Sequence, residues 1–210
     1  MDRKMAIKMF RVLEKRYKGA VTSLEYGNAF QLLAATILSA QCTDERVNKV
    51  TATLFRKYGT VKDFAGLKAR ELEPEIRSTG FYRNKAKNII SSAKMILESF
   101  GGKVPGNMEQ LVTLPGVARK TANIILYNIF DKNEGIAVDT HVKRVSGRLG
   151  LTKYGDPVRI ERDLMELFDR DKWGYLSNIL IQHGRRTCKA RKPDCPGCPV
   201  AGLCPSAGKF

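Results

Sequence analysis

Four cysteines near the C-terminus have a spacing that suits a metal centre. They follow the pattern Cys188-x6-Cys195-x2-Cys198-x5-Cys204. A zinc ion and a cubane iron–sulfur cluster both accept four thiolates, but structural zinc sites usually show two short cysteine pairs. Only Cys195 and Cys198 form such a pair here. The spacing therefore favours an iron–sulfur cluster, with zinc and unligated thiols as the alternatives.

The six-residue loop between Cys188 and Cys195 is basic, with positive charges at Lys189, Arg191 and Lys192. A bound metal would fix the shape of this loop, so that its charges could contact phosphate groups. The alternative is a solvated basic loop without a partner. Because the cysteines are clustered and no secretion signal is evident, we expect a metal in a reducing compartment rather than a disulfide framework.

A second segment, LPGVARKTA at 114–122, has the features of a phosphate-binding turn. A short helix is predicted to end near Val112 and a new helix to open at about Val117, with a Pro-Gly turn between them. The backbone N–H groups of Gly116, Val117 and Ala118 would then lie at a helix N-terminus, where phosphates bind without sequence preference. The alternative is an ordinary interhelical turn. A helix, a turn and a basic helix in close succession are typical of a helix–hairpin–helix DNA-binding motif.

Lys120 and Asp139 are the candidates for covalent chemistry. Lys120 falls in the first turn of the predicted helix, where the positive end of the helix dipole and the adjacent Arg119 disfavour an ammonium ion. A free amine at Lys120 could attack a sugar carbon. The alternative for Lys120 and Arg119 is a solvated charge or a phosphate contact. Asp139 ends the apolar run GIAV at 135–138. It could cap the next helix, stabilise a cationic sugar, or do both.

Two tight interhelical turns carry side chains that could act as wedges in DNA. The turn SAQCTD at 39–44 holds Gln41, and the turn GFYRNK at 80–85 holds Phe81. Wedges in the minor groove use such side chains, but so do a capping turn and a packed core. Arg83 and Lys85 are expected to add positive charge to a DNA-facing surface beside the second turn.

The chain as a whole is basic and has a helical pattern. Its 210 residues carry 37 Lys and Arg against 21 Asp and Glu, a net charge of +16, which indicates nucleic acid, an anionic membrane or an acidic protein as partner. The longest apolar stretch, 30–40, is too short to span a membrane. Apolar residues recur at helical spacing, so we predict an all-α fold. Helices are expected near 3–18, 29–41, 44–58, 68–79, 82–99, 107–112, 117–130, 140–149, 157–170 and 172–186.

Together the motifs closely resemble those of the endonuclease III family of DNA base-excision glycosylases. The matching segments are LSAQ-x-TD at 38–44, GFYRNKA at 80–86, LPGVARKTAN at 114–123, AVDTHVKR at 137–144 and the cysteine pattern. The resemblance implies two helical domains flanking a DNA-binding cleft, with a helix–hairpin–helix motif and a C-terminal four-cysteine loop. Residues 22–133 would form a six-helix domain. Residues 1–21 and 134–210 would form a discontinuous domain whose [4Fe–4S] cluster is held by Cys188, Cys195, Cys198 and Cys204.

The resemblance also implies roles for individual residues. Lys120 matches the nucleophile of the family, Asp139 its catalytic carboxylate, and Gln41 the residue that fills the gap left by a flipped base. Phe81 stands where many members have Leu, and Ala118 stands where the usual hairpin has Gly. Branches that remove adenine or mismatched thymine typically have Ser or Tyr in place of Lys120. A lysine therefore implies a bifunctional enzyme, a glycosylase and β-lyase.

The implied reaction is removal of oxidised pyrimidines from duplex DNA, followed by nicking of the abasic site through a lysine Schiff base. The alternatives are a glycosylase for uracil or mismatched thymine, a noncatalytic metal-stabilised DNA-binding protein, and an electron-transfer iron–sulfur protein. The expected partner is double-stranded DNA that contains damaged bases or abasic sites. We expect a monomer in the cytoplasm, associated with the nucleoid through DNA, with no membrane contact and no secretion.

Overall fold

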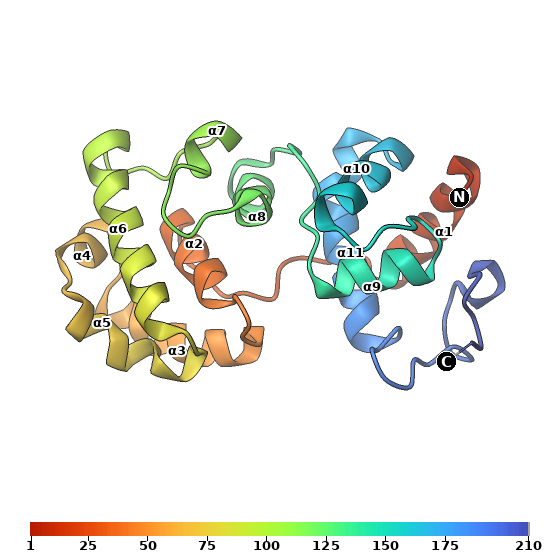
Figure 1. Cartoon of the computed structure of the whole chain (residues 1–210), viewed down its shortest axis with the longest axis horizontal. Coiled ribbons are helices and arrows are strands. Elements are labelled where there is room, and N and C mark those ends of the chain that lie inside the picture. The colour runs from red at the N-terminus through yellow and green to blue at the C-terminus, as the bar shows by residue number, and fades with distance from the viewer. Residues whose placement is uncertain (210) are drawn as a thin grey trace. The chain divides into compact units, whose positions relative to one another are not determined.

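The computed structural model describes residues 1–209, and all of the regular structure within that range is helical, which confirms the predicted all-α fold (Figure 1). The α-helices are α1 (Arg3–Arg16), α2 (Ala29–Leu38), α3 (Asp44–Lys57), α4 (Val61–Gly66), α5 (Ala69–Ile76), α6 (Tyr82–Phe100), α7 (Met108–Leu111), α8 (Arg119–Phe130), α9 (Thr140–Arg148), α10 (Pro157–Leu167) and α11 (Trp173–Arg186). Short 3-10 helices are η1 (Arg77–Thr79), η2 (Arg170–Lys172) and η3 (Ala201–Leu203). Within the described range, no helix is both long enough and apolar enough to cross a membrane.

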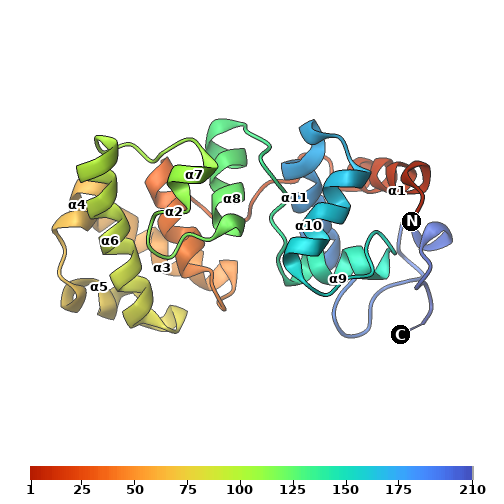
Figure 2. The same cartoon turned by 45° about the horizontal axis from the view of Figure 1, so that its top comes forward.

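The chain divides into two compact units, and the first is the continuous segment Ser23–Lys132. Within it, α6 packs against α4 and α5, and α2 packs against α3, α6 and α8 (Figure 2). Helix α2 is buried along its whole length from Leu32 to Leu38. A helix that is apolar on all sides belongs in the centre of a core, and α2 takes that place in this unit.

The second unit joins residues 1–22 to the chain from Asn133 onward. Helix α9 packs against α11, and α1 packs against α10 and α11. The hydroxyl of Tyr17 hydrogen-bonds with Nδ1 of His183 at 3.0 Å, and the backbone N–H of Gly19 donates to the hydroxyl of Tyr175 at 3.1 Å. The N-terminal helix is therefore part of the same core as the last helices of the chain.

Side-chain caps explain where several helices begin. Asn28, Thr43, Asn107 and Asp156 each accept a hydrogen bond from a backbone N–H in the first turn that follows. Such caps satisfy N–H groups that have no partner inside the helix. Local capping signals are thus sufficient to place these four starts.

The structure corrects the predicted helices at three places: one helix was missed and two boundaries shift. Helix α4 was not expected, because its six residues carry too short a pattern, but a reciprocal capping box between Thr60 and Asp63 starts it. Helix α2 ends at Leu38 rather than near 41, where the chain turns. Helix α8 begins at Arg119 rather than at Val117, because Ala118 has an extended backbone with φ −91° and ψ 169°.

Candidate functional site

The turn between α7 and α8 has the form of a hairpin, and side chains of α6 contact it. Gly116 has a φ of +79°, a left-handed conformation that favours glycine. A Cβ at this position would lie 2.8 to 3.0 Å from the side chain of Asn88. The hydroxyl of Ser92 donates to the carbonyl of Pro115 at 2.8 Å. Two side chains of α6 therefore fix the hairpin, and neither was identified from the sequence because they lie far from it along the chain.

The first turn of α8 follows this hairpin directly. Ala118 is the residue before the helix, and its φ of −91° is accessible to any L-residue. Alanine therefore fits where the usual hairpin of the family has glycine. Lys120 is the second residue of α8 and is exposed. The helix N-terminus supplies N–H groups and a positive dipole end, which are suited to a phosphate.

We expect Gly116→Ala to destabilise the protein by about 1–3 kcal/mol, because a side chain there requires a left-handed backbone and meets Asn88. It should also weaken binding to undamaged and damaged duplexes alike. Thermal unfolding and fluorescence anisotropy with both duplexes would measure the two effects. Gly66→Ala is the matched control, since a Cβ there meets nothing within 4 Å. Equal melting temperatures for the two variants would contradict the role given to Gly116.

Asp139 lies at the start of α9, where its Oδ1 accepts the backbone N–H of Val142 at 2.7 Å. The predicted capping role is therefore present. This bond orients the carboxylate and involves only one of its two oxygens. The capping role and a catalytic role are compatible in this geometry.

The segment that leads to Asp139 is held by side chains of α10 and α11. The backbone N–H of Ile136 donates to Oε1 of Glu161 at 3.1 Å, and the hydroxyl of Ser177 donates to the carbonyl of Ala137 at 2.8 Å. Glu161 and Ser177 are buried. Sequence reasoning missed both, although a glutamate between Ile160 and Leu164 on an apolar helix face is a signal of a buried hydrogen bond.

The two turns expected to carry wedges both hold a non-glycine residue in the left-handed region. Gln41 has a φ of +53° and is exposed. Phe81 has a φ of +48°, and 65% of its surface is exposed. The alternative of a core aromatic is therefore wrong for Phe81. An exposed phenylalanine on a tight turn is suited to insertion between bases.

Lys85 does not contribute to the exposed charge beside this turn. It is only 4% exposed, and its Nζ donates to the carbonyls of Leu38 and Thr79, each at 2.8 Å. The expectation that it faces DNA is corrected, because the lysine lies on the inner face of α6. Arg83 is exposed, as expected.

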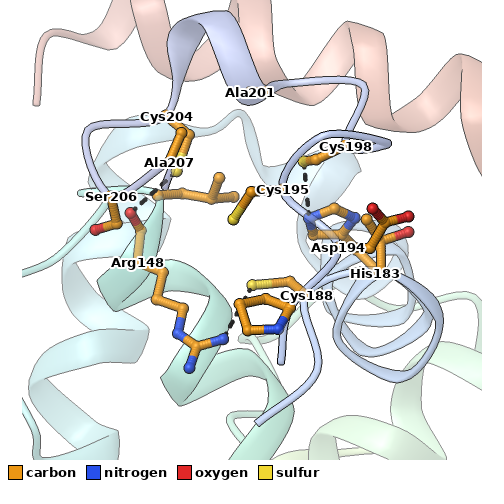
Figure 3. Close-up of a pocket in the computed structure, with 13 residues that line it drawn as sticks. Arg148, His183, Cys188, Asp194, Cys195, Cys198, Ala201, Cys204, Ser206 and Ala207 are labelled. Atoms are coloured by element: carbon orange, nitrogen blue, oxygen red, sulfur yellow. Dashed lines mark hydrogen bonds between the residues drawn. The ribbon is translucent and has the colours of Figure 1, made fainter. Parts of the chain in front are cut away.

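The four C-terminal cysteines line one pocket in the second unit and direct their sulfur atoms toward a common space (Figure 3). All four are free thiols and partly buried. Apolar groups, among them Leu149 and Ala207, complete the wall. Within the described residues, no three His, Cys, Asp or Glu side chains form a group that could hold a single metal ion, so the four sulfurs suit a larger cluster better than one zinc ion. Four sulfur donors around a shared apolar space are a donor set that fits an iron–sulfur cluster.

Neighbouring side chains contact these sulfurs. Nη1 of Arg148 donates to Sγ of Cys188 at 3.5 Å. Nε2 of His183 lies 3.8 Å from Sγ of Cys198. Burial lowers the pKa of His183 to about 4, so its imidazole is neutral near pH 7. Burial also raises the pKa of the Cys198 thiol, which disfavours the thiolate in the absence of a metal. A bound metal favours the thiolate and offsets this effect.

Two arginines on α9 hold the cysteine loop by its backbone. Nε and Nη2 of Arg144 both donate to the carbonyl of Cys188, each at 3.2 Å. Arg148 donates to the carbonyls of Lys189 and Ala190 at 2.7 and 3.0 Å. These contacts leave the side chains of Lys189, Arg191 and Lys192 exposed. The loop is thus ordered with its positive charges outward, which is the arrangement expected of a phosphate-contacting loop.

We expect Cys198→Ala to abolish iron incorporation and to lower the melting temperature by about 5–15 °C. Loss of a metal site costs several kcal/mol, and 1 kcal/mol corresponds to roughly 2–4 °C in a chain of this size. Iron content, absorbance near 400 nm and calorimetry would measure the change. Cys42→Ala is the control, because Cys42 lies outside the cysteine pocket. A Cys198→Ala protein that keeps its iron would contradict the assignment.

Comparison with known proteins gives matches along the chain. A family model described as HhH-GPD superfamily base excision DNA repair protein matches residues 34–170, and the iron-sulfur binding domain of endonuclease III matches residues 188–204. Endonuclease III of Synechocystis sp. is 56% identical over 98% of this chain and 96% of its own length. Endonuclease III of Bacillus subtilis is 47% identical over 88% and 84%, respectively. A solved structure of a trapped endonuclease III–DNA covalent intermediate, 41% identical, has a TM-score of 0.94 and covers 100% of this chain and 98% of that one.

Proposed function

Since the chain belongs to the endonuclease III family and is a DNA glycosylase and AP lyase, we propose that Lys120 is its nucleophile and Asp139 its catalytic carboxylate. The observation that carries the proposal is the position of Lys120, which is exposed in the first turn of a helix that opens from a glycine hairpin. A hairpin that binds the phosphate backbone would bring this amine to a neighbouring sugar.

In the first step, Nζ of Lys120 attacks C1′ of the damaged nucleotide as the bond between C1′ and the base breaks. The base leaves with the bonding electrons and takes up a proton. The carboxylate of Asp139 stabilises the positive charge that develops on the sugar. Its capping bond to the N–H of Val142 holds it in one orientation, so little reorganisation is needed as this charge forms.

In the second step, the Lys120 adduct opens to a Schiff base, which makes the protons on C2′ acidic. Loss of one of these protons expels the oxygen on C3′, and the strand is nicked 3′ to the site. The amine is released by hydrolysis of the Schiff base. The same lysine thus serves base removal and strand cleavage, and the covalent adduct is open to reduction by borohydride.

Access to C1′ requires the damaged base to leave the helix. We assign Gln41 and Phe81 to the space that the base vacates, because both are exposed on interhelical turns of one unit. Extrusion of a base costs a few kcal/mol and less for a poorly stacked one. This difference favours oxidised pyrimidines in double-stranded DNA as substrates.

We assign two parts of the chain to contacts with the phosphate backbone of DNA. The hairpin contributes the backbone N–H groups of Gly116, Ala118 and Arg119, and the cysteine loop contributes Lys189, Arg191 and Lys192. Val117 was also expected to contribute, but its N–H donates to the carbonyl of Leu114 at 3.0 Å, so Val117 supports the turn instead. A net charge of +16 adds a field that attracts DNA without regard to sequence. Binding of undamaged duplex should therefore weaken steeply as salt rises.

The chain carries a [4Fe–4S] cluster, as the match to the family's iron-sulfur binding domain indicates. We assign Cys188, Cys195, Cys198 and Cys204 as its ligands, because they line one pocket. When bound, the cluster supplies a cross-link among the four cysteines, and neither of the two steps above needs a change in its oxidation state. We further propose that the enzyme acts as a monomer in the cytoplasm, on the nucleoid.

The proposal is tested with duplex oligonucleotides that each carry one defined lesion, assayed with and without borohydride. We expect nicking of duplexes with thymine glycol or 5-hydroxycytosine and a covalent protein–DNA adduct when borohydride is present. Duplexes with uracil or a thymine mismatch test the other substrate classes. Base release without any trapped adduct would overturn the assignment of an amine nucleophile.

A further inference from the structure

Lys85 contacts both of the turns that carry the exposed wedge side chains. Its Nζ donates to the carbonyl of Leu38 and to the carbonyl of Thr79, each at 2.8 Å. Leu38 is the last residue of α2, three positions before Gln41, and Thr79 is the last residue of η1, two positions before Phe81. One ammonium group therefore hydrogen-bonds to Leu38 and Thr79, the residues that precede the two turns.

The backbone of Lys85 makes a further contact with the second turn. Its N–H donates to the carbonyl of Phe81 at 3.1 Å. Phe81 is thus linked to one residue twice, directly through its own carbonyl and through that of Thr79. Leu38 is 47 positions from Lys85 in the sequence. The side chain of Lys85 therefore connects α6 to the end of α2, which is distant from it along the chain.

Both turns need such support, because their central residues have left-handed backbones without being glycine. Gln41 and Phe81 have φ values of +53° and +48°, and such residues persist only where the surroundings determine the backbone. The last carbonyls of a helix have no partner inside it, and a cation there is favoured by the helix dipole. Burial lowers the pKa of Lys85, and an amine is seldom buried without a structural reason.

We propose that Lys85 is a positioning residue that sets the distance between Gln41 and Phe81, so that both side chains enter the same gap in the duplex. This inference rests on the wedge roles proposed above. The vacated space is the height of a single base, so two turns that move independently cannot fill it together. Lys85 touches neither DNA nor the reacting sugar, and it acts through the two turns.

The test compares base removal from a fully paired duplex with removal of the same 5-hydroxycytosine from a loop of unpaired bases. The wedge side chains are needed only for the paired substrate. The rate for the paired substrate divided by the rate for the loop does not depend on the fraction of protein molecules that are active. We expect Lys85→Met to lower this ratio by about tenfold. Lys87→Met is the matched control, because Lys87 is exposed on the same helix, and its ratio should equal that of the unchanged protein.

A double-mutant cycle then separates positioning from general loosening. In a background with Gln41→Ala and Phe81→Ala, Lys85→Met should change the ratio by less than about twofold, since the side chains that it positions are gone. The same tenfold loss in both backgrounds would overturn the proposal. If Lys85→Met does not fold, Lys85→Arg gives the comparison, because a longer planar guanidinium displaces the two carbonyls.

The outcome also distinguishes this inference from the proposed function. If the Gln41→Ala and Phe81→Ala background leaves the ratio unchanged, the wedge assignment fails, and Lys120 and Asp139 are unaffected by that result. If this background lowers the ratio but neither Lys85 variant does, only the positioning role of Lys85 is refuted.

Discussion

Lys120→Ala is expected to abolish the borohydride-trapped adduct and to lower strand cleavage by on the order of 10³-fold or more, since no other group is assigned to attack C1′. The side chain is exposed at the second position of α8, and alanine is the best helix former. Its removal should therefore leave the melting temperature and the affinity for undamaged DNA nearly unchanged. Single-turnover assays on an abasic-site duplex and denaturing gels of the trapped adduct would measure the loss.

A control for this variant is Lys94→Ala, which removes an exposed lysine of α6. It lowers the net charge by the same amount, so any loss that reflects only weaker attraction to DNA appears in both variants. Undiminished trapping in Lys120→Ala would show that another amine forms the Schiff base.

Replacement of Asp139 should separate its two roles. Asparagine and serine cap helices about as well as aspartate, so Asp139→Asn and Asp139→Ser are expected to keep the stability of α9 to within about 1 kcal/mol. Both lose the negative charge that we propose stabilises the cationic sugar. Base removal should fall by about 10²–10³-fold, the usual cost of removing one electrostatic partner of a transition state.

Asp139→Ala completes the comparison, because it loses the charge and the capping bond to Val142. Its melting temperature should lie below that of the other two variants by the equivalent of about 1 kcal/mol. Thermal unfolding and single-turnover base release, measured on all three, resolve the two contributions. If Asp139→Asn retains full base release while Asp139→Ala loses it, the residue acts only as a cap.

The residues with local signals were readily predicted from the sequence. The Pro-Gly turn predicted that Lys120 lies in the first turn of a helix, and the apolar run before Asp139 predicted its capping position. Their catalytic roles came from the family resemblance and stay predictions. The all-α fold follows from apolar periodicity, which needs no knowledge of distant contacts. The chain also matches its family in these same segments, so the local signals and the comparisons rest on the same residues.

The supporting contacts could not be predicted, because they join residues that are far apart in the chain. Glu161 meets Ile136 across 25 positions, and Lys85 meets Leu38 across 47. Lys85 shows the consequence most clearly, since composition alone counts it among the charges that face DNA. Only the packing of α6 against α2 reveals that its ammonium points inward.

The discontinuous second unit has a consequence for the order in which the protein matures. Residues 1–22 are made before the Ser23–Lys132 unit, but their partners, such as His183 and Tyr175, are made more than 150 positions later. The Ser23–Lys132 unit is one continuous, compact segment, so it can fold while synthesis continues. The unit that binds iron completes last, because its core requires both ends of the chain. Iron loading therefore requires the C-terminal part of the chain, and a product truncated after Lys132 would contain the hairpin and Lys120 but no metal centre.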